Sequence, residues 1–159
     1  MNEERFSVLN EAIRRNPDDP HPLIRRAVAW LDANERERAM QDLDAALALE
    51  PLHTDALGLR AAEHLNKGEF DDSIADCDAA LAKNPNFNPA LSLRGLAWLK
   101  LGEFQRAIFD FDRALALEPD QPIVLYSRGV AKQQLGDATG AELDFAMSNA
   151  LKGNRAKFN

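Results

Sequence analysis

Four arginines and four aspartates recur along the chain, each set at a spacing of 34 residues. Four guanidinium groups in a row could bind a phosphate or carboxylate ligand, whereas arginines matched with aspartates could form ion pairs inside the protein. We expect the ion pairs, because a charge at a partly buried position needs a partner. The residues concerned are Arg26, Arg60, Arg94 and Arg128, with Asp42, Asp76, Asp110 and Asp144.

Cysteine and histidine could support catalysis or bind a metal, yet their spacing here argues against both. Cys77 is the only cysteine, which excludes an internal disulfide and a cysteine-based zinc site, so we expect it in the core. His21, His53 and His64 lack the spacing of helical metal ligands or of an acid–base pair. We therefore predict no enzyme activity, no cofactor and no metal.

Three acidic doublets resemble calcium ligands only superficially, because residues two apart on a helix point in different directions. We expect the first aspartate of each doublet to be paired and the second to be solvated. The glycine-containing loops that hold calcium or phosphate are also missing. The doublets are Asp42 with Asp44, Asp76 with Asp78, and Asp110 with Asp112.

The composition favours a globular protein whose partners are other proteins. The 159 residues, 45% of them hydrophobic, suffice for one domain with a core, and the net charge of −7 disfavours nucleic acid as a partner. No apolar run approaches the length of a membrane span, and no secretory leader is recognisable. We expect a soluble cytoplasmic protein without membrane insertion.

The recurring charges belong to a longer internal repeat. Four prolines stand 34 residues apart and divide most of the chain into units 20–53, 54–87, 88–121 and 122–155, each numbered here from position 1 to 34. Apolar residues at positions 4, 8 and 11, and again at 20, 24, 27 and 28, follow the faces of two helices. Glycine or asparagine at position 15 supplies the left-handed backbone that ends the first helix. The prolines are Pro17, Pro51, Pro85 and Pro119.

Unit 88–121 resembles a tetratricopeptide repeat, a 34-residue helix-turn-helix with small, aromatic and proline positions. Other units depart from the pattern at His64, Lys132, Arg36 and Ala138, which replace aromatic residues. Ser148 and Asn149 end the last unit, where a terminal repeat needs a polar outer face. The residues that carry the resemblance are Leu91, Gly95, Trp98, Gly102, Phe104, Ala107, Phe111, Ala114 and Pro119.

The resemblance implies an all-α, right-handed superhelical solenoid that forms a single domain over residues 1–159. Leu9, Ala12 and Ile13 match the second half of a repeat, so we expect residues 1–19 to form a half-repeat whose helix caps the stack. The predicted parts are 1–19, then repeats 20–53, 54–87, 88–121 and 122–155, and a tail over 156–159.

The resemblance also implies that the first helices of the repeats line a concave groove. Apolar residues dominate the groove-facing positions, with Asp32, Asn66, Lys100 and Gln134 at the rim. Alternatively, these side chains pack against residues 154–159 or the first helix. The predicted groove residues are Ile24, Val28, Leu31, Leu59, Ala62, Leu65, Leu93, Leu96, Leu99, Ile123, Tyr126 and Val130.

We therefore predict a non-catalytic adaptor or scaffold whose groove binds a helical or extended apolar segment of a partner protein. Chaperone adaptors of this family bind acidic carboxyl termini through a clamp of Lys, Asn and Arg. The matching positions here carry Ile24, Val28, Leu59, Pro89 and Leu93, or, one unit later, Gly58, Ala62, Leu93, Ile123 and Ser127, so the clamp is absent.

An alternative function is self-assembly, in which the repeat ends stack or form a homodimer. A subunit that accompanies a separately encoded enzyme is a third reading, because fold does not fix function.

Overall fold

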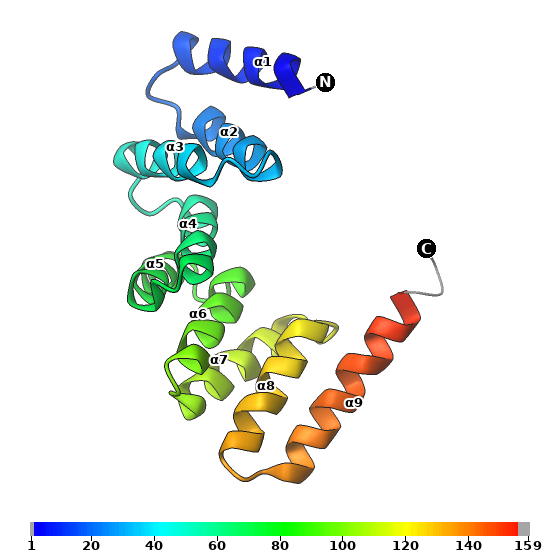
Figure 1. Ribbon diagram of the computed structural model, residues 1–159. Coiled ribbons are helices and arrows are strands. Elements are labelled where there is room, and N and C mark those ends of the chain that lie inside the picture. Colours follow the sequence, from blue (N-terminus) through cyan, green and yellow to red (C-terminus); the bar gives the residue numbers. More distant parts are fainter. Residues whose placement is uncertain (1, 156–159) are drawn as a thin grey trace.

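The described part of the chain is entirely helical. The structure, a computed structural model, describes the backbone of residues 2–155 and the side chains of residues 4–153. Over that range it contains nine α-helices and no strand, joined by short turns (Figure 1). The helices are α1 (Asn2–Arg15), α2 (Pro20–Asp32), α3 (Arg36–Leu49), α4 (Thr54–Lys67), α5 (Phe70–Lys83), α6 (Asn88–Lys100), α7 (Phe104–Leu117), α8 (Pro122–Gln134) and α9 (Ala138–Arg155).

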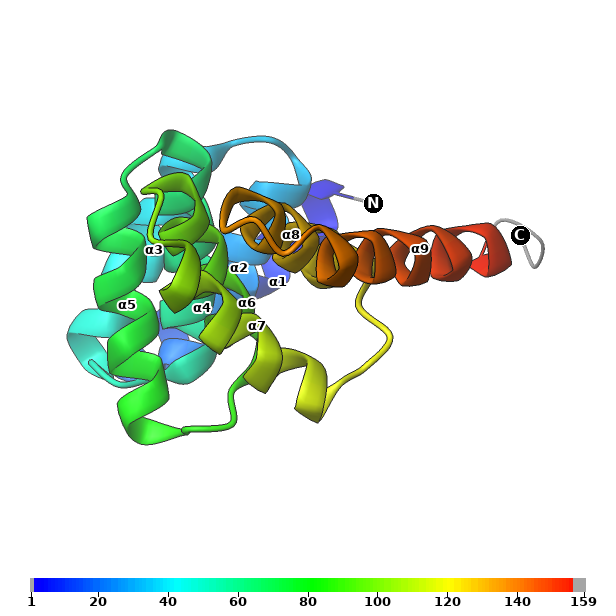
Figure 2. The same cartoon turned by 90° about the horizontal axis from the view of Figure 1, so that it is seen from below.

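The helices pair into four hairpins that stack one after another along an arc, with α1 at one end and α9 at the other (Figure 1). The hairpins are α2–α3, α4–α5, α6–α7 and α8–α9, and each packs on the next. First helices also touch across repeats, α4 against α6 and α6 against α8, which puts them on the inner side of the curve. The prediction of a helical solenoid is confirmed. Figure 2 shows α9 extending beyond the stack.

The turn within each hairpin is set by the residue at position 15. All four residues there have positive φ, as the sequence predicts: 60° at Asn34, 82° at Gly68, 78° at Gly102 and 83° at Gly136. The next backbone amide then donates to the carbonyl five residues earlier, as Glu103 does to Trp98 at 2.9 Å. This closes the end of the first helix and turns the chain back.

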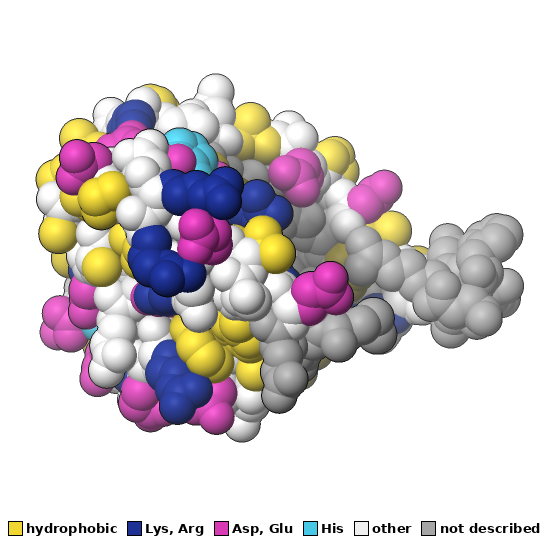
Figure 3. All heavy atoms as spheres, turned by 90° about the horizontal axis from the view of Figure 1, so that it is seen from above, with side chains coloured by type: hydrophobic (Ala, Val, Ile, Leu, Met, Phe, Trp, Pro, Cys, Tyr) yellow, Lys and Arg dark blue, Asp and Glu magenta, His cyan; other side chains and the backbone are white. Residues whose placement is uncertain are grey.

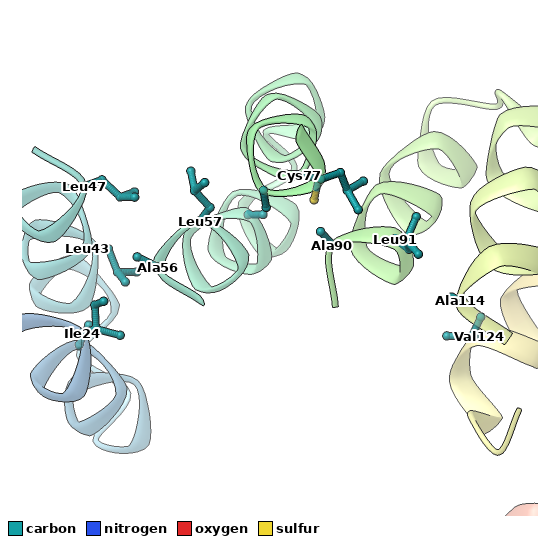
Figure 4. Packing of buried hydrophobic residues seen from close by; sticks show 14 of the residues in the cluster. Ile24, Leu43, Leu47, Ala56, Leu57, Cys77, Ala90, Leu91, Ala114 and Val124 are labelled. Atoms are coloured by element: carbon teal, nitrogen blue, oxygen red, sulfur yellow. The ribbon is translucent and has the colours of Figure 1, made fainter. Parts of the chain in front are cut away.

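A continuous row of buried side chains runs along the stack, from Ile24 and Leu43 through Leu57 and Leu91 to Val124 (Figure 4). The side chains at positions 8 and 24 of a hairpin have complementary sizes, so that a phenylalanine at position 24 faces a glycine at position 8. A Cβ added to Gly95 would lie 2.6 Å from Cε1 of the Phe111 ring, and one added to Gly129 would lie 2.6 Å from Cε1 of Phe145. The pairs are Ala27 with Leu43, Ala61 with Cys77, Gly95 with Phe111, and Gly129 with Phe145.

The two ends of the stack differ. At the first end, α1 packs on α2 with Leu9 buried and the Phe6 and Trp30 rings stacked 4.0 Å apart. At the last end, Asn149 is exposed at the position where earlier hairpins bury a leucine. The predicted polar role of Ser148 is wrong, because this side chain is fully buried and its Oγ donates to the Pro122 carbonyl at 2.7 Å.

No described helix combines the length and the apolar character that a membrane span requires.

The close approach of Gly95 to the Phe111 ring predicts that the effect of Gly95→Ala on stability depends on the residue at position 111. With Phe111 present, crowding costs about 1–3 kcal/mol and outweighs the roughly 1 kcal/mol that alanine gains in a helix. With Phe111→Leu, the combination found in the first hairpin, the same change is expected to stabilise. Urea unfolding of the two singles and the double tests this, and equal effects of Gly95→Ala in both backgrounds would contradict it.

Candidate functional site: the concave groove and the ion pairs behind it

Each hairpin is bridged by an arginine on its first helix and an aspartate on its second. The guanidinium donates two hydrogen bonds, from Nε and Nη2, to the two carboxylate oxygens of the aspartate sixteen residues later. Donor–acceptor distances are 2.6–2.8 Å in all four hairpins. The pairs are Arg26–Asp42, Arg60–Asp76, Arg94–Asp110 and Arg128–Asp144.

The same arginines also donate a hydrogen bond to the preceding hairpin, or to α1 in the case of Arg26. These contacts were not predicted from the sequence. Nη1 of each arginine donates to the residue sixteen positions earlier. The expectation that the second aspartate of each doublet is merely solvated is therefore wrong, because it is half-exposed but ion-paired across the repeat boundary. The contacts are Arg26–Asn10 at 2.7 Å, Arg60–Asp44 at 2.8 Å, Arg94–Asp78 at 2.5 Å and Arg128–Asp112 at 2.6 Å.

We call the three hydrogen bonds of one such arginine a fork: its inner arm binds the aspartate sixteen residues later, and its outer arm binds the residue sixteen positions earlier. Burial makes the inner arm the stronger one. The side chain of Arg94 is 18% exposed and that of Asp110 is 2% exposed, whereas Asp78 is 56% exposed. The hydrogen bonds that Arg94 donates to Asp110 and Asp78 raise its pKa against the opposing effect of burial. Burial alone would raise the pKa of the Asp144 carboxyl, but bonds from Arg128 and Lys132 bring it below its usual value. The charges are therefore held as ion pairs.

The forks leave little of each guanidinium for a ligand. Nε, Nη1 and Nη2 each already donate to a protein acceptor, in all four arginines. We therefore assign the four arginines to the scaffold, in which they hold the first helix of each hairpin in place.

The predicted groove residues differ in how much surface they present. Ile24 is buried, and Leu31, Leu59, Leu93, Leu96 and Leu99 are half-buried against the core. Val28, Ala62, Leu65 and Val130 are also half-buried. Ile123 and Tyr126 on α8 are 68% and 51% exposed. The predicted rim residues Asp32, Asn66, Lys100 and Gln134 are all exposed.

A cleft of about 900 Å³ opens between α1 and α2 at the first end of the stack. Ile24 and Val28 line it from α2, and Val8, Leu9 and Ala12 line it from α1. The first helix, one of the two segments that could pack against the groove residues, therefore borders part of the predicted groove. The other segment, residues 154–159, lies outside the residues whose side chains the structure describes. The surface seen from the α1 end mixes hydrophobic side chains with charges of both signs (Figure 3).

Cys77 lies in the core row, as the sequence predicts, with no exposed surface. Burial raises the pKa of its thiol to about 12, so the reactive thiolate does not form at neutral pH. His21 and His53 lie edge to face, with ring centroids 5.2 Å apart, although they are 32 positions apart in the chain. Neither group forms part of a recognisable catalytic arrangement in the described residues.

The stacked hairpins and their inner surface define a helical-repeat scaffold protein. The tetratricopeptide repeat family matches the chain over residues 25–86, 59–122 and 93–148, which together cover most of it. The chain therefore belongs to the tetratricopeptide repeat family, whose members are protein-interaction modules.

Solved structures of MamA share the fold. A MamA RS-1 double mutant is 24% identical, with a TM-score of 0.84, over 97% of this chain and 86% of that one. MamA 41-end from Desulfovibrio magneticus RS-1 is 24% identical, with a TM-score of 0.83, over 96% and 86%. A further crystal structure of MamA is 19% identical, with a TM-score of 0.80, over 94% and 87%. Comparison with curated proteins gave no significant sequence match.

The forks predict unequal effects of removing their two acceptors. Asp110→Asn removes the charge that a buried arginine needs and should cost about 1–3 kcal/mol of stability, as should Arg94→Ala. Asp78→Asn removes a solvent-exposed partner and should cost less than about 1 kcal/mol. Urea midpoints measure both, and an unchanged midpoint for Arg94→Ala would refute a stabilising pair.

Proposed function

We propose that this protein is a non-catalytic interaction module that binds an apolar segment, helical or extended, of a partner protein in its concave groove. The observation that supports this most directly is the exposure of Ile123 and Tyr126 on α8, the first helix of the last hairpin, which contacts α6. These are large apolar side chains on the inner helices, where packing between repeats does not use them.

Burial of these two side chains would supply the anchor of such a complex. An isoleucine or aromatic side chain moved from water into a fitted apolar pocket contributes roughly 1.5–3 kcal/mol, and a few such anchors dominate typical interfaces. The ring of Tyr126 is already oriented, because it lies 5.2 Å from the Phe145 ring, and the Lys152 ammonium lies 5.4 Å from its centroid. A preordered anchor loses less entropy on binding.

The chemistry of the groove favours an apolar partner segment over an acidic carboxyl terminus. The positions that hold the carboxylate clamp in chaperone adaptors here carry aliphatic residues such as Val28 and Leu93. Exposed polar residues at the rim, Lys100 and Gln134 among them, are suited to setting the orientation of the segment.

Self-assembly through the repeat ends is the second candidate. It draws support at the first end, where Val8 is exposed beside the cleft between α1 and α2. It is weaker at the last end, because Glu142 and Asn149 are exposed there. Gel filtration with light scattering separates the two functions: a concentration-dependent mass above 17.7 kDa that Val8→Glu returns to the monomer would support self-assembly.

The groove hypothesis predicts that Ile123→Glu/Tyr126→Glu weakens partner binding by more than about tenfold, because it places two charges at the anchor. The partner is first captured from native lysate and identified by mass spectrometry. Its binding segment is then titrated calorimetrically against wild type and variants.

The matched control is Phe109→Glu/Leu143→Glu, which changes two equally exposed apolar residues on the second helices α7 and α9. Circular dichroism must show that both variants fold. Equal affinity of the groove variant and wild type, or loss of binding by the control alone, would move the site away from the groove.

A further inference from the structure

The turn of the second hairpin differs from its counterparts in the first and third. In the first hairpin the Arg38 guanidinium lies 4.7 Å from the centroid of the Trp30 ring, with Nε 3.8 Å from an oxygen of Glu35. In the third, Arg106 lies 4.7 Å from the Trp98 centroid and 3.9 Å from Glu103. Both turns thus hold a cation between an aromatic ring and a carboxylate.

The second hairpin keeps the glutamate but replaces the other two residues. His64 stands at the tryptophan position, and Asp72 stands at the arginine position, so a positive charge is lost and a second carboxylate is gained. None of the ion pairs in the described part of the chain neutralises Asp72. The turn therefore brings two carboxylates together at a place where the neighbouring hairpins have a cation.

The three side chains converge across the turn. His64 Nδ1 lies 2.6 Å from Glu69 Oε2, and one ligand atom from each of His64, Glu69 and Asp72 lies within 4.8 Å of the others. Glu69 precedes α5 but makes no side-chain capping bond to it, so in the described part of the chain its carboxylate is held by His64 and not by the helix. The imidazole is 18% exposed and comes from the end of α4, which fixes its position between two helices.

We propose that His64, Glu69 and Asp72 form a binding site for a divalent transition-metal ion of the zinc type. Imidazole nitrogen with carboxylate oxygen is a ligand set that suits Zn²⁺ and its neighbours better than Ca²⁺ or Mg²⁺, which prefer oxygen alone. Zinc bonds to these atoms are about 2.0–2.2 Å long, so the ligand atoms need to stand roughly 3.5 Å apart. Side-chain rotations would have to bring the ligand atoms this close, and water would complete the coordination.

Nδ1 is the His64 ring nitrogen that faces the carboxylate of Glu69, and it is therefore the ligand atom in this proposal. The other ring nitrogen, Nε2, lies 3.9 Å from Oδ2 of the buried Asp76. In the metal-free protein the 2.6 Å contact between Nδ1 and Glu69 Oε2 places the ring proton on Nδ1. Binding of the ion at Nδ1 would shift that proton to Nε2, on the side of Asp76. The ion would take the place of the guanidinium of the sister turns and tie the end of α4 to the start of α5. This proposal does not rest on partner binding in the groove.

Isothermal titration of the full, chelator-treated chain with ZnCl₂ tests the proposal. We expect one ion per chain, a rise in the melting temperature on zinc addition, and affinity reduced by at least about tenfold in His64→Asn and in Asp72→Asn. Asp71→Asn, a neighbouring exposed carboxylate, and the double variant His21→Asn/His53→Asn should bind as wild type does. Asp72→Arg, which restores the arginine of the sister turns, should abolish binding and raise the melting temperature without metal.

Absence of zinc binding by wild type would overturn the proposal and leave a plain His64–Glu69 hydrogen bond. Binding that is lost with His21 and His53 but kept in His64→Asn would overturn it as well, because it would assign the ion to the other histidine pair.

Discussion

The arginine fork is the interaction on which the rest of this structure depends. One guanidinium holds the aspartate sixteen residues later, within its own hairpin, and the polar residue sixteen positions earlier, in the preceding helix pair. Within a hairpin the pair is largely buried, so breaking it strands a charge. The contact between hairpins is exposed at the surface. The four forks therefore fix both the closure of each hairpin and the register of each hairpin on the next.

The scaffold leaves the inner helices free to present side chains for binding. Because the forks and the size-matched pairs of glycine and phenylalanine hold the hairpins together, the groove-facing residues do not all have to pack. Leu93 and Leu96 on α6 still contribute to packing between repeats, whereas Ile123 and Tyr126 on α8 do not, and this difference places the proposed anchor near the last hairpin. The tetratricopeptide fold provides the frame, and the exposed side chains decide what it binds.

The repeat made most of this architecture predictable from sequence. The left-handed residues from Asn34 to Gly136 follow directly from the spacing, as does the buried Cys77. The contact between each arginine and the preceding hairpin was not predicted. The second aspartate of each doublet had been considered only within its own hairpin, whereas its partner is the arginine of the following hairpin. The His64 cluster was missed for a related reason: its ligands come from two helices across a turn. The reversal of charge at Asp72, against Arg38 and Arg106, was the signal that could have revealed it.

Native-state hydrogen exchange measures directly whether the forks couple the hairpins into one cooperative unit. If they do, amides in α2 through α7 will exchange through a common opening, with similar protection at the centres of these helices. In that case no hairpin opens alone. If the amides of α2 and α3 exchanged through a separate opening of much lower free energy than those of α4 to α7, the forks would not couple the repeats.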